Sequence, residues 1–376
     1  MQHYHTRIAQ LSELLASYKY PLPFSEHLKQ YFRVHKNAGS KDRREIRAIS
    51  YAFFRIANAL DNKDFNHISE IAANFIDHQG DMQDFINEPN GFHIENIFPF
   101  NEYISQVFLG LESQMAANPD FQLSFLRQPP VWVKIKPGKE AEVSAELKSE
   151  NIAFDKYSEQ VLSFENELKL TDLQSFKKGF FRIQDLSSQL VSEYYHASEG
   201  ETWWDCCAGA GGKSLALLED NPGIKLFASD IRESILNNLH ERHSQAGNRN
   251  INIFAADLSQ PIINQKLPEF DGIIVDAPCS GSGTWARNPE NLYYFDPETI
   301  NSYQSRQISI LTNAFPFLKT GKPIIYITCS VFKGENEDVI SSFAKDNEVK
   351  IEEQKYLEGY KNGAENMFIC RMIKTD

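Results

Sequence analysis

The sequence predicts an α/β protein whose C-terminal half is a doubly wound, mostly parallel sheet. From residue 184 onward, segments typical of strands and of helices alternate to the end of the chain. Within this region, residues 202–205 form a strand-like run that leads into a glycine-rich turn and a helix. Residues 1–118 and 129–185 show other patterns, and the 376-residue chain is long enough for three domains.

Residues 1–118 predict an all-α domain. Apolar residues recur at three-to-four spacing in four segments, 8–18, 26–35, 42–60 and 102–117. The stretch from Lys29 to Arg47 is rich in lysine and arginine. Such a basic face is either ordinary solvated surface or a contact for RNA phosphates, and the sequence leaves both interpretations open.

Pro129-Pro130 marks the next boundary, because a residue before proline is disfavoured in a helix. Beyond it the pattern is strand, helix, strand, strand, helix, strand, over 130–136, 139–151, 153–157, 161–166, 170–179 and 180–185. This order predicts a ferredoxin-like α+β domain, an arrangement shared by RNA-binding modules and by domains that bind no nucleic acid. Six basic residues give it a basic edge: Lys134, Lys136, Lys139, Lys177, Lys178 and Arg182.

The last part of the chain predicts further strands at 225–230, 250–257, 270–276, 322–329, 349–354 and 366–373. Helices are expected between them at 233–247, 304–318 and 336–347. Four of the strands end in an acid or a cysteine: Asp230, Asp257, Asp276 and Cys329. Because the carboxyl ends of parallel strands meet at one edge, we expect these side chains to share a crevice with the glycine-rich turn.

The glycine-rich turn lies in the sequence DCCAGAGGKS, residues 205–214. Its glycines let the backbone approach a ligand, and the first N–H groups of the next helix point toward it. A P-loop would need glycine at Cys207, and a dinucleotide fingerprint would need glycine at Ser214. The turn therefore predicts a different small-molecule site, with Asp230 placed to hold ribose hydroxyls. A plain strand-to-helix turn without a ligand is the alternative.

The composition argues against several classes of protein. A net charge of −13 argues against nonspecific coating of nucleic acid, although it leaves room for a local basic face. Five cysteines show neither a disulfide framework nor paired zinc-binding motifs, which indicates a reducing compartment. The chain has no long apolar run and no signal-peptide pattern at its start. We therefore expect a cytoplasmic protein without a metal site or a membrane partner.

Two cysteines follow neighbouring strands of the predicted sheet. Cys279 lies in DAPCSGSGT, which begins at Asp276, and Cys329 lies in ITCS. The arrangement places two thiols and a carboxylate at the ligand crevice, where Lys213 and the helix terminus would favour a thiolate. For either cysteine alone, a buried structural role is an equal alternative.

Such a set of groups suits one reaction in particular. Carbon 5 of cytosine becomes nucleophilic once a thiolate adds to carbon 6, and a carboxylic acid at N3 favours that addition. A base then removes the proton from carbon 5 so that the thiolate can leave. One thiol can attack while the other assists release.

Four segments, in this order and spacing, resemble the RNA cytosine-5 methyltransferases of the RsmB/Sun/NOL family: DCCAGAGGKS, IIVDAPCSGSGTWARNPE, YQSRQISIL and IYITCSVFKGENEDVI. Upstream, GFFRIQDLSSQLV resembles the motif before the family's core, and its Asp185 and Gln189 are expected to hold the core against the RNA-side domain. The resemblance implies a Rossmann-like class I methyltransferase domain at 186–376. It also implies ferredoxin-like and NusB-like RNA-binding domains at 129–185 and 1–118.

The resemblance also implies S-adenosylmethionine as the cofactor and RNA as the partner. Cys329 would be the nucleophile, Cys279 would assist product release, and Asp276 would lie beside the reacting base. Asp230 would bind the ribose of the cofactor, and Asp257 would lie near its adenine. The other residues expected to line the cofactor, together with Asp276, are Cys207, Ala208, Gly209, Ala210, Gly211, Gly212 and Lys213.

The chain departs from the family pattern in two places. Gly209-Ala210 replaces Ala-Pro, which we expect cofactor binding to tolerate, and 365–368 replace a D-G-F-F-like strand. The expected function is methylation of a cytosine in RNA, most simply 16S ribosomal RNA, by a monomer through a covalent bond between Cys329 and carbon 6. The alternatives are a transfer-RNA cytosine-5 methyltransferase and a catalytically silent RNA-binding factor of ribosome assembly.

Overall fold

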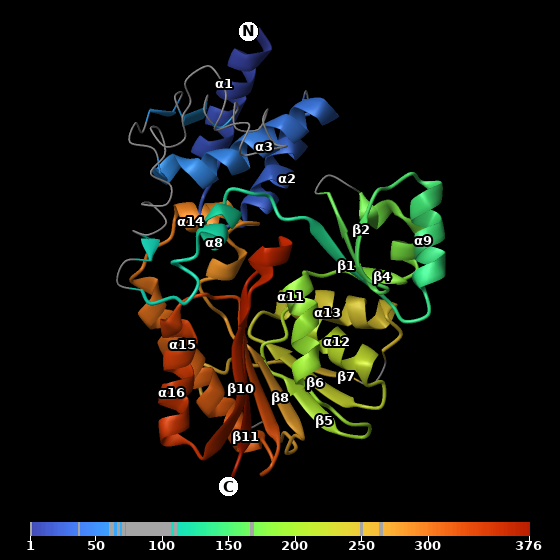
Figure 1. Ribbon diagram of the computed structural model, residues 1–376, viewed down its shortest axis with the longest axis vertical. Coiled ribbons are helices and arrows are strands. Elements are labelled where there is room, and N and C mark those ends of the chain that lie inside the picture. The colour runs from blue at the N-terminus through green and yellow to red at the C-terminus, as the bar shows by residue number, and fades with distance from the viewer. Residues whose placement is uncertain are drawn as a thin grey trace. The chain divides into compact units, whose positions relative to one another are not determined.

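The computed structural model describes residues 2–36, 38–59, 111–165, 169–248, 251–262 and 266–376, together with 64, 65, 68, 69, 72, 107 and 108. The chain divides into two compact units, one of residues 1–127 with 285–297 and the other of 128–284 with 298–376 (Figure 1). Most of the predicted helical segment 102–117 lies outside the described residues. The three predicted domains and their boundaries stay a prediction.

The first unit contains an N-terminal helical region, as the apolar spacing predicts. Among the described residues its helices are α1 (Gln2–Ser17), α2 (Phe24–Val34), α3 (Ser40–Ile56), η1 (Ala57–Ala59), α8 (Pro119–Ser124) and α14 (Pro289–Tyr293). The periodicity predicted neither α8 nor α14, which are only six and five residues long. Helix α14 packs on α3. It also contacts α2, because Oε1 of the buried Glu290 accepts a hydrogen bond from the N–H of Phe24, the first residue of α2, at 3.2 Å. Segment 285–297 therefore adds to this unit despite following the Cys279 loop.

The second unit contains a small antiparallel sheet with strand order β2-β3-β1-β4. Its elements are β1 (Val131–Ile135), α9 (Glu140–Ser149), β2 (Asp155–Ser158), β3 (Val161–Phe164), η2 (Leu170–Asp172), α10 (Gln174–Lys177) and β4 (Phe181–Ile183). The prediction of one helix over 170–179 was wrong. Leu173 is extended, with ψ of 145°, and a carboxylate oxygen of Glu146 accepts the Gln174 N–H at 2.6 Å. This tertiary cap begins a second, separate helix.

A mixed, mostly parallel sheet of seven strands forms the rest of this unit, with order β10-β11-β9-β8-β5-β6-β7. Strand β11 is antiparallel to both β10 and β9, and the other neighbouring strands pair in parallel. The strands are β5 (Thr202–Asp205), β6 (Lys225–Asp230), β7 (Ile251–Ala255), β8 (Gly272–Asp276), β9 (Pro323–Thr328), β10 (Val349–Leu357) and β11 (Met367–Lys374). The prediction of a doubly wound sheet is confirmed. Two strands end earlier in the sequence than predicted: β7 ends before Asp257, and β9 ends before Cys329.

Helices cover both faces of this sheet (Figure 1). One face packs on α15 (Thr299–Ala314) and α16 (Glu337–Asp346), and the other on α12 (Gly212–Asp220) and α13 (Glu233–Gln245). The remaining short helices are α11 (Leu186–Leu190), η3 (Val191–Tyr194), η4 (Ser282–Thr284), η5 (Phe315–Phe317), η6 (Lys333–Glu335) and η7 (Gly359–Asn362).

Two adjacent tryptophans on β5 anchor the two faces. Trp203 packs with Leu217 of α12, Trp204 packs with Ile310 of α15, and both indoles are fully buried. A Cβ on Gly272 of β8 would come within 2.4 Å of the Trp203 ring, so only glycine allows β8 to lie beside β5 there. The strand order reverses between β5 and β8, which is where a sheet of this type forms its ligand crevice.

None of the helices in the described part of the chain combines the length and the apolar composition that a membrane-spanning helix needs.

Candidate functional site

The glycine-rich turn joins the end of β5 to the start of α12. Gly209 and Gly211 have positive φ angles, 52° and 80°, which glycine adopts without strain. A Cβ on Gly211 would lie 3.0 Å from both the His243 ring and Leu239 of α13. Glycine is therefore needed at 211 both for the backbone angle and for the close approach of α13.

Asp230 holds the turn from the end of β6. Its Oδ2 accepts the Gly209 N–H at 3.0 Å, and its Oδ1 accepts the Arg232 N–H at 2.9 Å. Burial raises the pKa of Asp230, but the hydrogen bonds from Arg232 and Gly209 outweigh it, and the pKa lies below its usual value. The carboxylate is therefore ionised and rigidly held, and it can accept hydroxyl hydrogen bonds.

Asp257 lies after β7, at the edge of the sheet, and is exposed. Its Oδ1 accepts the Ser259 N–H at 2.9 Å and the Ser259 hydroxyl at 2.7 Å, and these bonds lower its pKa. The Ala256 N–H donates to the Asp230 carbonyl oxygen at 3.2 Å, which ties this loop to the end of β6. Strands β5 and β6 separate Asp257 from Asp276, so these two acids occupy different parts of the strand-end edge.

Lys213 and Asp276 form an ion pair at the point where the strand order reverses. Lys213 Nζ lies 2.7 Å from Asp276 Oδ2, and the lysine side chain is only 11% exposed. Burial lowers the pKa of Lys213, but the negative charge of Asp276 outweighs it, so the lysine remains charged. The pair links the turn after β5 to the end of β8.

The sulfur atoms of Cys279 and Cys329 lie 3.3 Å apart. Cys279 follows β8 and Cys329 follows β9, and both are half-buried free thiols. The hydrogen bond with Cys329, together with burial, holds the pKa of Cys279 well above its usual value. Cys279 therefore keeps its proton, and either of the two sulfurs can be the donor in this contact.

The residue-based prediction missed two buried carboxyl groups next to these groups. Glu335, at the end of η6, accepts hydrogen bonds from the residues that follow both cysteines. Asp205, at the end of β5, accepts the Ser214 hydroxyl at 2.5 Å. Sequence spacing gave no sign of either contact, although both acids lie in segments that carry the family resemblance.

Burial raises the pKa of Asp205 to about 7, with a smaller contribution from the charge of Asp276. Because this folded-state pKa lies above the usual value of 3.8, the folded protein binds the proton more tightly than the unfolded chain. The stability that this proton contributes is lost as the pH rises through about 7. The wild type loses this stability progressively between about pH 3.8 and about pH 7. We therefore expect Asp205→Asn, which can still accept the Ser214 hydroxyl, to unfold at a higher temperature than the wild type, with a large difference at pH 8.5 and a clearly smaller one at pH 5.5. Thermal melts of both proteins, with Asp257→Asn as the exposed control, test this prediction, and an equal difference at both pH values contradicts it.

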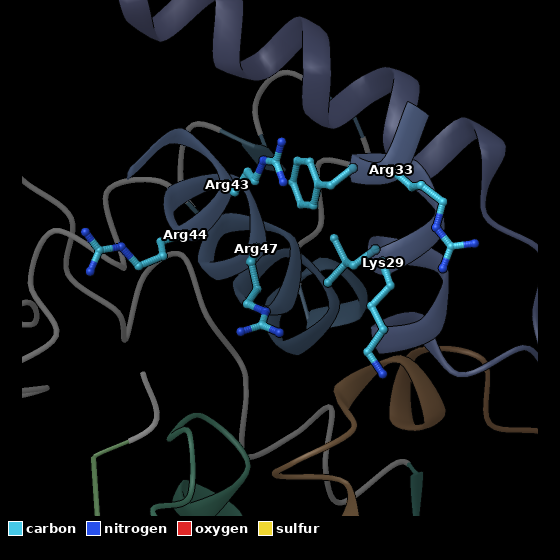
Figure 2. A pocket seen from close by; sticks show the side chains of 7 residues that line it. Lys29, Arg33, Arg43, Arg44 and Arg47 are labelled. Atoms are coloured by element: carbon cyan, nitrogen blue, oxygen red, sulfur yellow. The ribbon is translucent and has the colours of Figure 1, made fainter. Parts of the chain in front are cut away.

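The helical unit has a basic hollow of about 400 Å³ between α2 and α3. Figure 2 shows five cationic side chains lining it, Lys29 and Arg33 from α2 and Arg43, Arg44 and Arg47 from α3. The Arg43 guanidinium lies 5.5 Å from the centre of the Phe32 ring and donates to the Ala38 carbonyl at 2.9 Å. Lys36 and Lys41, the other cations of this stretch, do not line the hollow.

A family model described as 16S rRNA methyltransferase RsmB/F matches residues 194–374, the segment that carries the glycine-rich turn and both cysteines. Residues 194–374 belong to the RsmB/F family. This family comprises S-adenosylmethionine-dependent RNA cytosine-5 methyltransferases.

Individual relatives of this RsmB/F-family chain agree with that result. A probable ribosomal RNA small subunit methyltransferase B from Synechocystis is 33% identical over 181 residues, 48% of this chain and 40% of the relative. The chain spans about half the length of the curated relatives it matches.

Solved structures show the same fold at low sequence identity. PH0851 matches with a TM-score of 0.73 at 20% identity, covering 98% of this chain and 97% of that chain. NSun6 from Pyrococcus horikoshii, solved with SFG, matches with a TM-score of 0.62 at 16% identity, covering 74% of this chain and 98% of that chain.

Proposed function

We propose that this RsmB/F-family protein transfers a methyl group from S-adenosylmethionine to carbon 5 of a cytosine in RNA. The observation that carries the proposal is the 3.3 Å distance between the sulfurs of Cys279 and Cys329. Cys279 lies in the loop that follows Asp276, the partner of Lys213 in the ion pair at the end of β8. In this assignment Cys329 attacks carbon 6, Cys279 assists release, and Asp276 lies beside the reacting base.

The residues around the glycine-rich turn fit the methyl donor. Glycines without a Cβ leave the backbone open to a ligand, and the first turn of α12 presents N–H groups toward it. In this proposal the ionised Asp230 accepts hydrogen bonds from the ribose hydroxyls, and the exposed Asp257 lies near the adenine. When bound, the cofactor supplies an electrophilic methyl group. Cys207, Ala208, Gly209, Ala210, Gly211, Gly212 and Lys213 line it.

The two thiols divide the work on the cytosine. As the sulfur of Cys329 bonds to carbon 6, the electron pair of the ring double bond moves to carbon 5, which then takes the methyl group. A base removes the proton from carbon 5, and the electrons of that C–H bond re-form the double bond and expel the Cys329 sulfur. Cys279, which keeps its proton, lies where it can donate to the departing sulfur.

The proposed substrate is 16S ribosomal RNA in the cytoplasm, which the name of the matching family supports. A target cytosine has to leave its stack to reach Cys329, so we expect a loop or an unfolded precursor as the substrate. Tritium release from RNA labelled at carbon 5 of cytosine tests the assignment, with 16S rRNA fragments compared with transfer RNA. Release from transfer RNA alone contradicts the ribosomal substrate, and release from neither contradicts the activity.

Two further parts of the chain are proposed to hold the RNA. The order β2-β3-β1-β4, with helices between β1 and β2 and between β3 and β4, supports a ferredoxin-like RNA-binding domain. The helical region is proposed to be NusB-like and to contact RNA phosphates through its basic hollow (Figure 2). Phosphate contacts would allow an acidic chain to bind RNA locally.

The basic hollow gives a direct prediction for RNA affinity. We expect Arg47→Glu to weaken binding of a 16S rRNA fragment by roughly tenfold and to reduce the dependence of log Kd on log salt by about one phosphate contact. Lys41→Glu, the matched control, makes the same charge change on the exposed part of α3 outside the hollow. Fluorescence anisotropy at several salt concentrations measures both effects. Equal losses in the two variants would mean that overall charge, and not the hollow, governs affinity.

A further inference from the structure

The side chain of Glu335 is completely buried and contacts both loops that carry the cysteines, the loop after β8 and the loop after β9. It ends η6, on the chain that leaves β9 and enters α16. A buried carboxyl group needs hydrogen-bond donors to offset its desolvation, so its partners indicate what it holds in place.

The hydrogen bonds that the Glu335 carboxyl group makes within the described part of the chain all come from donors. The Ser280 N–H and hydroxyl donate to it at 2.7 and 2.5 Å, and the Ser330 hydroxyl donates at 2.5 Å. The Gln307 side-chain amide of α15 donates at 3.2 Å. The N–H and amide groups can only donate, so Glu335 serves as an acceptor. Burial raises the pKa of Glu335, and the hydrogen bonds from Ser280, Ser330 and Gln307 oppose this rise by favouring the charged form.

Ser280 and Ser330 are the residues directly after Cys279 and Cys329. One carboxyl group therefore binds the neighbours of both thiols and ties the loop after β8 to the loop after β9. The Gly283 N–H also donates to the Cys329 carbonyl at 2.8 Å, and Ser282 and Ser330 hydroxyls lie 3.2 Å apart. These contacts form a closed hydrogen-bond network with Glu335 at its centre.

The next residue strengthens the same network. The Thr328 hydroxyl donates to Asn336 Oδ1 at 2.6 Å, and the Asn336 amide donates to the Ser330 carbonyl at 2.9 Å. Glu335 and Asn336 thus bind the residues on both sides of Cys329. The position of that sulfur depends on side chains six and seven residues further along the chain.

Glu335 also acts on Cys279 electrostatically. The titratable groups next to Cys279 include Cys329 at 3.3 Å, Glu335, and Tyr326, whose hydroxyl donates to the Glu335 carbonyl at 2.6 Å. The Lys213–Asp276 ion pair lies on the Cys329 side, where Lys213 interacts with the Cys329 sulfur. The charge of Glu335 is among the causes that raise the pKa of Cys279, after the Cys329 contact and burial. A negative charge on Glu335 favours the protonated form of the Cys279 thiol.

We propose that Glu335 is a positioning residue that holds the two sulfurs in contact and assigns them different roles, keeping Cys279 as the proton donor and leaving Cys329 to attack. The inference deepens the proposed function and rests on it only for the assignment of those roles. The contacts with Ser280 and Ser330 are a property of the folded chain without RNA or cofactor.

The test combines a thiol readout with an activity readout. In Glu335→Gln the negative charge is lost, so alkylation of Cys279 by iodoacetamide, followed peptide by peptide by mass spectrometry, should reach its half-maximal rate at a lower pH. Single-turnover methylation of a 16S rRNA fragment should fall by about 100-fold, because a displaced reacting group costs about that much. Asp338→Asn is the control and should change neither quantity, because Asp338 is a partly exposed acid that pairs with Lys333 at 3.3 Å.

The two readouts separate the inference from the proposed function. An unchanged Cys279 alkylation profile in folded Glu335→Gln overturns the inference, whatever the activity. A shifted profile in a protein whose wild type methylates no RNA supports the electrostatic role of Glu335 and refutes the proposed function instead. If Glu335→Gln does not fold, Ser280→Ala with Ser330→Ala keeps the charge and removes two of its contacts. This double variant should lose methylation with an unchanged alkylation profile, and full activity would overturn the positioning role.

Discussion

Cys329→Ala is expected to abolish methylation, with a loss of at least about 10⁴-fold in single-turnover rate. No covalent bond to carbon 6 can form without this sulfur, and carbon 5 of cytosine is then too weak a nucleophile to take the methyl group. Neither tritium release nor a covalent RNA complex should be detectable. Thermal melting should change little, because Cys329 is only half-buried.

The matched control is Cys370→Ala, in β11. Cys370 is completely buried in the core of the sheet, and burial raises its pKa to about 12, so its thiol is inert. This variant should lose stability and keep its activity per folded molecule. Methylation that survives in Cys329→Ala would show that the nucleophile is assigned to the wrong residue.

Cys279→Ala is expected to trap the enzyme on its substrate. Cys329 can still attack and the methyl group can still be transferred, but the proton donor 3.3 Å from the Cys329 sulfur is gone. Multiple turnover should fall by roughly 100-fold or more, while a covalent RNA complex accumulates. Denaturing gel electrophoresis with labelled RNA shows such a complex as a slowly migrating band.

The double variant completes this experiment. Cys279→Ala combined with Cys329→Ala should form no covalent complex, because the trapped bond is to Cys329. The reverse result, in which Cys329→Ala accumulates the complex and Cys279→Ala forms none, would make Cys279 the nucleophile. The two single variants therefore distinguish the two possible orders of thiol chemistry.

The amino-acid sequence predicted most of the fold because strand and helix periodicity are local properties. Strand β6 was predicted with the bounds it has, and the doubly wound order placed the turn after β5 and the loops after β8 and β9 at one edge. The errors occur where tertiary contacts overrule local pattern. The helix predicted over 170–179 is divided because Glu146, from another helix, caps Gln174 and Ser175. Segment 285–297 packs in the helical unit because its buried side chains, such as Trp285 and Leu292, find their partners there.

The class of fold, the glycine-rich turn and the two thiols could all be predicted from the amino-acid sequence, since each is a short pattern whose residues lie close together along the chain. Tertiary structure alone decided the 3.3 Å separation of sulfurs that are 50 residues apart, the pairing of Lys213 with Asp276, and the place of Glu335 beneath both loops. These features depend on how far apart neighbouring strands pack and on which buried donors need an acceptor. No local periodicity records that information, because the groups that meet belong to elements distant in sequence.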